Sequence, residues 1–155
     1  MTELKELNTI QNTNNDKKLR CKFNFLEKLI MELKKRDIPY NIVKIINQYI
    51  DEINSFSGSS KDLRKKMYKA KTKILNLLEK ELKLVPKNAY RRKWMVLGMS
   101  IFGVPMGAAF GASLGNMAFL GIGIAVGMGI GIAIGAEMDK KAMEEGRQLD
   151  LEIKF

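Results

Sequence analysis

Side chains able to carry out covalent or metal chemistry are scarce in this chain. It has no histidine and a single cysteine, Cys21, so it can form neither a cysteine and histidine metal cluster nor an internal disulfide. No convincing pair of a nucleophile and its general base can be recognised. We therefore expect a protein that is not an enzyme and that uses no cofactor or metal.

Glycine is the residue type with the most regular spacing. Residues 94–136 contain no charged side chain and hold all but two of the 13 glycines. Glycine costs a helix about 1 kcal/mol relative to alanine in water, so this enrichment needs a compensating cause. In lipid, small residues let two helix backbones approach until van der Waals contacts and weak Cα hydrogen bonds form. The predicted physical role of this region is close helix packing.

Two runs of glycine follow a four-residue interval. The first run is Gly103, Gly107, Gly111 and Gly115, and the second is Gly123, Gly127, Gly131 and Gly135. At about 100° per residue the second run covers one side of a helix. Roughly the opposite side carries Gly121, Ala125, Gly129 and Ala133. A helix with two faces of small residues can pack closely against two other helices. We expect one of these to be the first span of the same chain and the other to belong to a second copy, which gives a homo-oligomer.

The glycine pattern also allows two weaker interpretations. Residues 121–131 read GxGxxxGxGxG, which superficially resembles a phosphate-binding loop, but no strand, lysine or acidic ribose partner surrounds it. Residues 121–135 also alternate small and larger apolar residues, which is typical of a strand. Since residues 95–114 do not alternate and a lone strand in a bilayer leaves its backbone unsatisfied, helices are favoured.

The elements that must position these glycines are two membrane-spanning helices. About 20 residues at 1.5 Å each cross the hydrocarbon core, so residues 95–136 suffice for two spans. We place the spans at residues 95–114 and 118–136, joined by a tight turn. Pro105 lies in the first span and predicts a kink or a hinge. A basic and aromatic interface cluster precedes it, formed by Arg91, Arg92, Lys93 and Trp94.

These repeats are similar to those of the glycine-zipper family of small membrane proteins, in which GxxxGxxxG repeats pack transmembrane helices. The resemblance covers about residues 95–141. It implies tight helix packing in a membrane but says little about a biochemical activity.

The region before the spans is predicted to be helical. Residues 1–15 are expected to form a flexible tail, residues 16–85 a basic helical domain and residues 86–94 a linker. Within the domain, apolar residues recur every three or four positions in three segments. These segments are 17–36, 39–54 and a third that begins near Ser59, where Asp62 completes a capping-box pattern, and ends near Leu84. We expect an all-α fold, a three-helix bundle or coiled-coil hairpin followed by the spanning hairpin.

Residues 137–155 are expected to form a cytoplasmic helix and tail. The helix should end at Gly146, because glycine is common just past helix ends. From Leu149 to Phe155 apolar and polar residues alternate. This pattern fits a tail that is disordered or docked on its own chain, or a strand that adds to the sheet of a protein partner.

The charge distribution indicates where the protein is located. Residues 1–93 carry a net charge of +12 and residues 137–155 a net charge of −2. The uncharged turn and the basic flanks predict that both termini are cytoplasmic. The Lys-, Ile- and Asn-rich composition suits a low-GC bacterium, so the expected location is a bacterial inner membrane.

The cations of residues 61–73 form either a solvated face or a face for lipid or an acidic partner. The expected lipid partner is anionic, because each Lys or Arg near an anionic leaflet contributes about 1 kcal/mol. Only Tyr68 interleaves with these cations and no nucleic-acid motif accompanies them, which argues against nucleic acid.

Two functions follow from these features. The first is an oligomeric integral membrane protein whose hairpins form a pore or perturb the bilayer, as a bacterial toxin or defence effector would. The second is a membrane anchor or scaffold that recruits partners through the basic helical domain and the C-terminal tail. No charged ring lines either span, so a conduction path would be narrow, hydrophobic or weakly selective.

Overall fold

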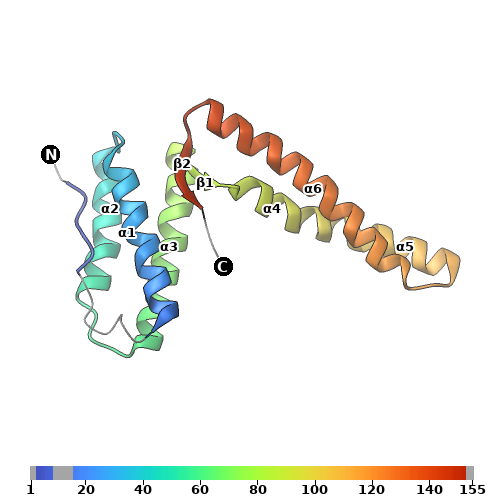
Figure 1. The fold of residues 1–155 in the computed structure, drawn as a ribbon, viewed down its shortest axis with the longest axis horizontal. Coiled ribbons are helices and arrows are strands. Elements are labelled where there is room, and N and C mark those ends of the chain that lie inside the picture. The colour runs from blue at the N-terminus through green and yellow to red at the C-terminus, as the bar shows by residue number, and fades with distance from the viewer. Residues whose placement is uncertain (1–2, 9–15, 153–155) are drawn as a thin grey trace. The chain divides into compact units, whose positions relative to one another are not determined.

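The computed structural model describes residues 3–8 and 16–152, and most of these residues are helical. In chain order the elements are α1 (Lys17–Lys34), α2 (Tyr40–Asn54), α3 (Ser60–Leu82), β1 (Val85–Lys87), α4 (Ala89–Gly98), the π-helical turn η2 (Met99–Gly103), α5 (Val104–Leu114), α6 (Phe119–Glu144) and β2 (Gln148–Glu152) (Figure 1). The prediction that helix dominates the fold is confirmed, with one short strand pair in addition. The chain divides into two compact units, Met1–Leu84 and Val85–Phe155.

The helices of the first unit begin where the sequence supplies caps. Asp16 Oδ1 accepts hydrogen bonds from the backbone N–H groups of Lys18 (3.0 Å) and Leu19 (3.1 Å), so it caps α1. Ser59 Oγ accepts from the Asp62 N–H (3.2 Å) and donates to the Asp62 carboxylate (2.6 Å). The predicted cap at the start of α3 is therefore confirmed. These contacts satisfy N–H groups that have no partner within the helix.

The core of the first unit lies between its three helices, with α3 packed against α1 and α2. The side chains that are fully buried there include Leu19, Leu29, Leu33, Ile46, Met67, Ile74 and Leu78. Cations of α3 lie over aromatic rings at the edge of this core. Lys71 Nζ is 4.0 Å from the centre of the Phe25 ring, and Lys73 Nζ is 5.5 Å from that of Tyr49. Each such contact adds about 0.5–1 kcal/mol at an exposed site.

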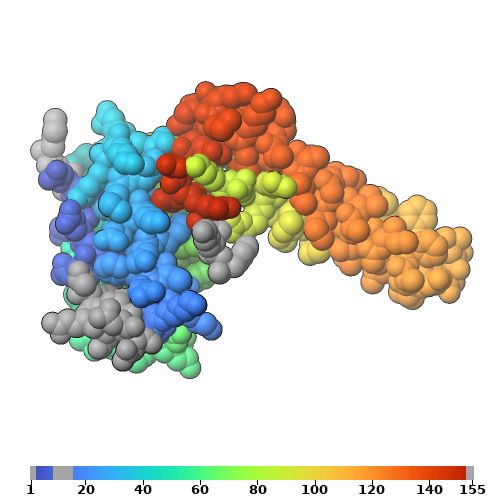
Figure 2. Space-filling model, viewed as in Figure 1, coloured from blue at the N-terminus to red at the C-terminus, as the bar shows by residue number. Residues whose placement is uncertain are grey.

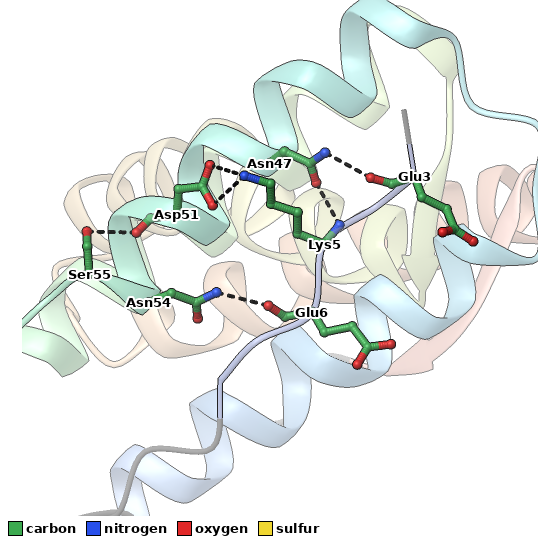
Figure 3. Close-up of polar contacts among 7 residues, drawn as sticks. All are labelled: Glu3, Lys5, Glu6, Asn47, Asp51, Asn54 and Ser55. Carbon is green, nitrogen blue, oxygen red and sulfur yellow. Dashed lines mark hydrogen bonds and ion pairs between the residues drawn. The ribbon is translucent and has the colours of Figure 1, made fainter. Parts of the chain in front are cut away.

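Residues 3–8 lie along α2, although the sequence predicts a flexible tail over residues 1–15. Asn47 Nδ2 donates to the Glu3 carbonyl (3.0 Å) while Asn47 Oδ1 accepts from the Lys5 N–H (2.9 Å) (Figure 3). Two helical turns further on, Asn54 bonds in the same way to the Glu6 carbonyl and the Asn8 N–H. These two amide side chains pair with the backbone as a neighbouring strand would, which holds the segment in place. Residues 9–15 of the predicted tail lie outside the described residues.

In the second unit, α4, η2 and α5 form one helical run that packs along α6. We call these four elements, residues 89–144, the hairpin. Residues 121–135 are helical, so the strand interpretation of their alternation is wrong. The helices extend beyond the spans drawn from the sequence, outward to Ala89 and Glu144. Both are long and apolar enough to cross a membrane.

The second unit also contains a two-stranded parallel sheet formed by β1 and β2. Pro86 lies opposite Leu149, and the register slips between Pro86 and Lys87. Leu149 and Leu151 are buried, while the Lys87 ammonium pairs with the exposed Asp150 carboxylate. The alternating C-terminal sequence thus forms a strand over residues 148–152 that pairs within its own chain. Its last residues, 153–155, lie outside the described part.

Candidate functional site: the glycine face of the hairpin

Backbone meets backbone where the two helical runs of the hairpin cross. A Cβ added at Gly127 would lie 2.5 Å from the Gly103 nitrogen and 2.5 Å from the Gly98 carbonyl oxygen. A Cβ at Gly123 would lie 2.5 Å from the Gly107 Cα. Carbon atoms of side chains do not approach other atoms this closely, so only glycine fits these positions in the packed helices.

The same contact continues to the end of the hairpin where α4 begins and α6 ends. A Cβ at Gly131 would lie 2.7 Å from the Trp94 carbonyl carbon. One at Gly135 would lie 2.6 Å from the Tyr90 carbonyl oxygen and 2.7 Å from the Arg91 nitrogen. The second glycine run therefore faces the first helical run along four successive turns.

Not every glycine of the predicted packing set lies in this contact. Gly111 lies near the turn, where an added Cβ would be 3.3 Å from Met117 Sδ. Gly115 ends α5 with φ = 64°, a left-handed conformation that glycine adopts without steric cost. A Cβ at Gly121 or Gly129 would have no described atom within 4 Å beyond the local helix backbone. These two glycines lie on the outer side of α6.

Gly98 belongs to the packing face but falls outside the four-residue pattern. It is buried against Gly127 and Gly131, five residues before Gly103. The π-turn η2 accommodates the extra residue, because its N–H groups reach back five residues: the Val104 N–H donates to the Met99 carbonyl. Pro105 follows at the start of α5 and lacks the N–H of a regular helical bond. Pro105 therefore lies directly after a local π-turn, and the interval of five between Gly98 and Gly103 is the sequence signal of that turn.

Asp139 links α6 to the start of α4 at the open end of the hairpin. Its side chain is buried, and its two carboxylate oxygens accept hydrogen bonds from the Tyr90 N–H (3.1 Å) and the Arg91 N–H (2.9 Å). These N–H groups belong to the first turn of α4, whose own cap residue, Asn88, makes no side-chain capping bond. An acidic group also interacts favourably with the positive end of a helix. Asp139 continues the interval of four that links Gly131 and Gly135, but this spacing does not indicate that its carboxylate caps another helix, so its role was not predicted from the sequence.

The interface cluster predicted at residues 91–94 forms the first turns of α4. Arg91 and Lys93 are exposed there, and Arg92 and Trp94 are partly exposed. The backbone of this cluster packs beneath Gly131 and Gly135, so its side chains extend outward from a helix end that is fixed in position.

The outside of the hairpin is apolar. Large exposed side chains cover both helical runs, among them Val96, Ile101, Phe102, Phe110, Ile122, Val126, Ile130 and Ile134. Figure 2 shows the turn end of the hairpin, coloured orange. Apolar exposure on this scale marks a surface that contacts a membrane or another protein.

No protein-family model, curated protein or solved structure matches this chain. The functional inference therefore depends on the hairpin and on the charged surface of the first unit.

Proposed function

We propose that this chain is an integral membrane protein whose hairpin anchors a basic helical unit at a membrane surface. The observation that supports this best is the distribution of side chains on the hairpin. Its helices contact each other through glycine backbone and direct large apolar side chains outward. This combination suits a membrane, where backbone polar groups must be satisfied within the helices, the outer surface must be apolar and small residues favour close helix packing.

The proposed orientation places both termini in the cytoplasm of a bacterial cell. The turn between α5 and α6 carries no charge, while Arg91, Arg92 and Lys93 lie near the start of α4 and Lys140 and Lys141 lie near the end of α6. Positively charged flanks are retained on the cytoplasmic side. The first unit, which precedes the hairpin, would then be cytoplasmic.

Labelling of single cysteines tests this topology. Cys21 is the only cysteine and is exposed, so the natural chain reports on the first unit. A Cys21→Ser, Asn116→Cys variant reports on the turn. In intact cells without an outer membrane barrier, we expect a membrane-impermeant maleimide to label position 116 and to label Cys21 only after permeabilisation. Labelling of Cys21 in intact cells, or release of the protein by alkaline carbonate, would contradict the proposal.

The geometry favours an anchor over a pore formed by one chain. The facing glycines leave no room for a single Cβ, so water cannot pass between the two helical runs at these positions. A pore would require several hairpins.

A second candidate function is therefore an assembly of hairpins that opens or perturbs the bilayer. The outer face of α6, with Gly121, Ala125, Gly129 and Ala133, supports it because all four residues are exposed and small. Crosslinking in vesicles tests assembly, and dye release from the same vesicles tests the pore. We expect Gly121→Leu, Gly129→Leu to reduce crosslinked dimer, while Ala108→Leu, Ala112→Leu on α5 does not. Intact vesicles after verified insertion would exclude the pore.

A further inference from the structure

A strongly cationic concave surface lies between α1 and α3 in the first unit. It is an open groove of about 370 Å³. Its cationic lining is Lys18, Lys22, Lys61, Arg64, Lys65 and Lys69. The sequence placed four of these on one helix, and packing adds Lys18 and Lys22 of α1 to the same surface. The groove therefore concentrates charge from segments about 40 residues apart in the chain.

Acidic side chains neutralise this groove only in part. Asp16 Oδ2 lies 3.4 Å from Arg64 Nε, and Asp62 Oδ1 lies 3.7 Å from Lys65 Nζ. Lys61 also acts on Asp62, whose pKa is lowered first by the Ser59 hydroxyl and further by Lys65 and Lys61. Two carboxylates thus face six cations, and the groove retains a positive charge that attracts anions.

Tyr68 gives the groove an amphipathic rim. Its side chain is exposed, and Lys22 Nζ lies 4.7 Å from the centre of its ring. Tyrosine is enriched at membrane interfaces, where its ring contacts acyl chains and its hydroxyl contacts headgroups. Among the described residues that line the groove, Tyr68 is the only aromatic one. A single ring offers little stacking for successive bases, so this surface is poorly suited to single-stranded nucleic acid.

We propose that this groove binds the phosphate headgroups of anionic lipid, an inference that depends on the proposed membrane location. Exposed lysines donate to phosphate oxygens without fixed geometry, and Arg64 adds a planar donor group. An open, shallow site suits headgroups presented at a surface, where each nearby cation contributes about 1 kcal/mol. The groove would hold the first unit against the same leaflet that the hairpin enters.

Reconstituted full-length protein provides the test, with a fluorophore on Cys21, which is exposed on α1 beside Lys22. Vesicles contain phosphatidylcholine with or without phosphatidylglycerol, and a spin-labelled headgroup quenches the fluorophore when the groove meets the surface. We expect quenching to rise with phosphatidylglycerol. The variant Lys61→Glu, Lys65→Glu, Lys69→Glu should lose this rise. The control Lys28→Glu, Lys44→Glu, Lys80→Glu makes the same change in charge outside the groove and should keep it.

Other readouts separate the alternatives. Flotation and carbonate extraction of the same samples measure hairpin insertion, so full insertion without any phosphatidylglycerol dependence overturns the groove and leaves the anchor intact. Equal losses in both charge variants would indicate diffuse attraction and also overturn it. Complete competition by soluble glycerol phosphate would indicate a free-phosphate site, and a groove-dependent affinity for an oligonucleotide alone would indicate nucleic acid. Either result contradicts the proposal. Circular dichroism of each variant verifies that the helices persist.

Discussion

The close packing of the two helical runs depends on the absence of a Cβ at the facing glycines. Gly127 and Gly129, two residues apart in α6, allow the effect of this packing to be measured separately from the effect of helix propensity. Gly127→Ala places a Cβ against the backbone of Gly98 and Gly103, whereas Gly129→Ala meets open space. Both substitutions increase helix propensity by the same amount, because alanine is favoured over glycine in a helix by about 1 kcal/mol in water. We expect Gly127→Ala to destabilise the hairpin by about 1–3 kcal/mol through overpacking, and Gly129→Ala to be neutral or stabilising. Denaturation in detergent followed by circular dichroism measures both, and equal effects would contradict the described packing face.

The carboxylate of Asp139 is the second residue on which closure depends. Asp139→Ala leaves the part-buried N–H groups of Tyr90 and Arg91 without their acceptor, which costs about 1 kcal/mol or more. The exposed neighbour Glu137 supplies the control, since Glu137→Ala removes the same charge at the same helix end. We expect only the Asp139 variant to lower the melting temperature in detergent. It should also increase hydrogen exchange at the start of α4.

Regular spacing indicated several of the glycines that pack, but it also included Gly111 and Gly115, which lie outside the close contact of the two helical runs. Gly103, Gly107 and the run from Gly123 lie at intervals of four, which one helical face requires. Gly98 was missed because a π-turn shifts its interval to five. Asp139 was missed because its role is to cap another helix, and partners across a tertiary contact are not encoded in local spacing.

Asn47 and Asn54 of α2 hold residues 3–8 in an ordered position along that helix. Asn47→Ala, Asn54→Ala removes the bonds that these two amides make with the segment. The burial of Leu4 and the exposed ion pairs of Lys5 with Asp51 and of Glu6 with Lys34 remain as attachments. We expect the segment to lose protection from hydrogen exchange while α1 and α3 keep theirs. Asn41→Ala, Gln48→Ala changes two exposed amides of the same helix and serves as the control. Unchanged protection in the first variant would show that the amides are not what holds the segment.

The cap of α3 gives the first unit a dependence on pH. The pKa of Asp62 is lowered, chiefly by the hydrogen bond from Ser59 and then by Lys65. A lowered pKa means that the stabilisation is complete above the ordinary value of 3.8 and is lost as the pH falls through the lowered value. Ser59→Ala should therefore lower the melting temperature at pH 7 and have less effect at a pH below the lowered pKa of Asp62. The exposed Ser57→Ala is the control, and a pH-independent difference would contradict the contribution of the hydrogen bond from the Ser59 hydroxyl to the Asp62 carboxylate.

Elements with internal periodicity could be predicted, and those that depend on distant partners could not. The three-to-four spacing indicated α1, α2 and α3 because a helix buries one face of a continuous segment. β1 has only three residues and includes Pro86, so it carries no period of its own. It forms because β2, more than 60 residues later, supplies its hydrogen-bond partners.

At the scale of the whole molecule, the division into two units predicts different solubilities. The fragment of residues 1–84 contains the core between α1, α2 and α3, so we expect it to be soluble, monomeric and helical without detergent. The fragment of residues 85–155 exposes the apolar exterior of the hairpin and should require detergent. Gel filtration and circular dichroism of both fragments measure this. A first fragment that is unfolded alone would show that its small core depends on the rest of the chain.

Because of the π-turn, the alignment of the glycine face depends on the number of residues between Gly98 and Gly103. One extra residue advances a helix by about 100°, and η2 absorbs that phase difference so that Gly98 and Gly103 remain in line. Insertions elsewhere in either helix would rotate every contact beyond them, whereas deletion of one residue within Met99–Phe102 would turn an interval of five into an interval of four. The first helical run thus carries one extra residue between Gly98 and Gly103, and its deletion would bring these two glycines to the interval of four found in the rest of the run.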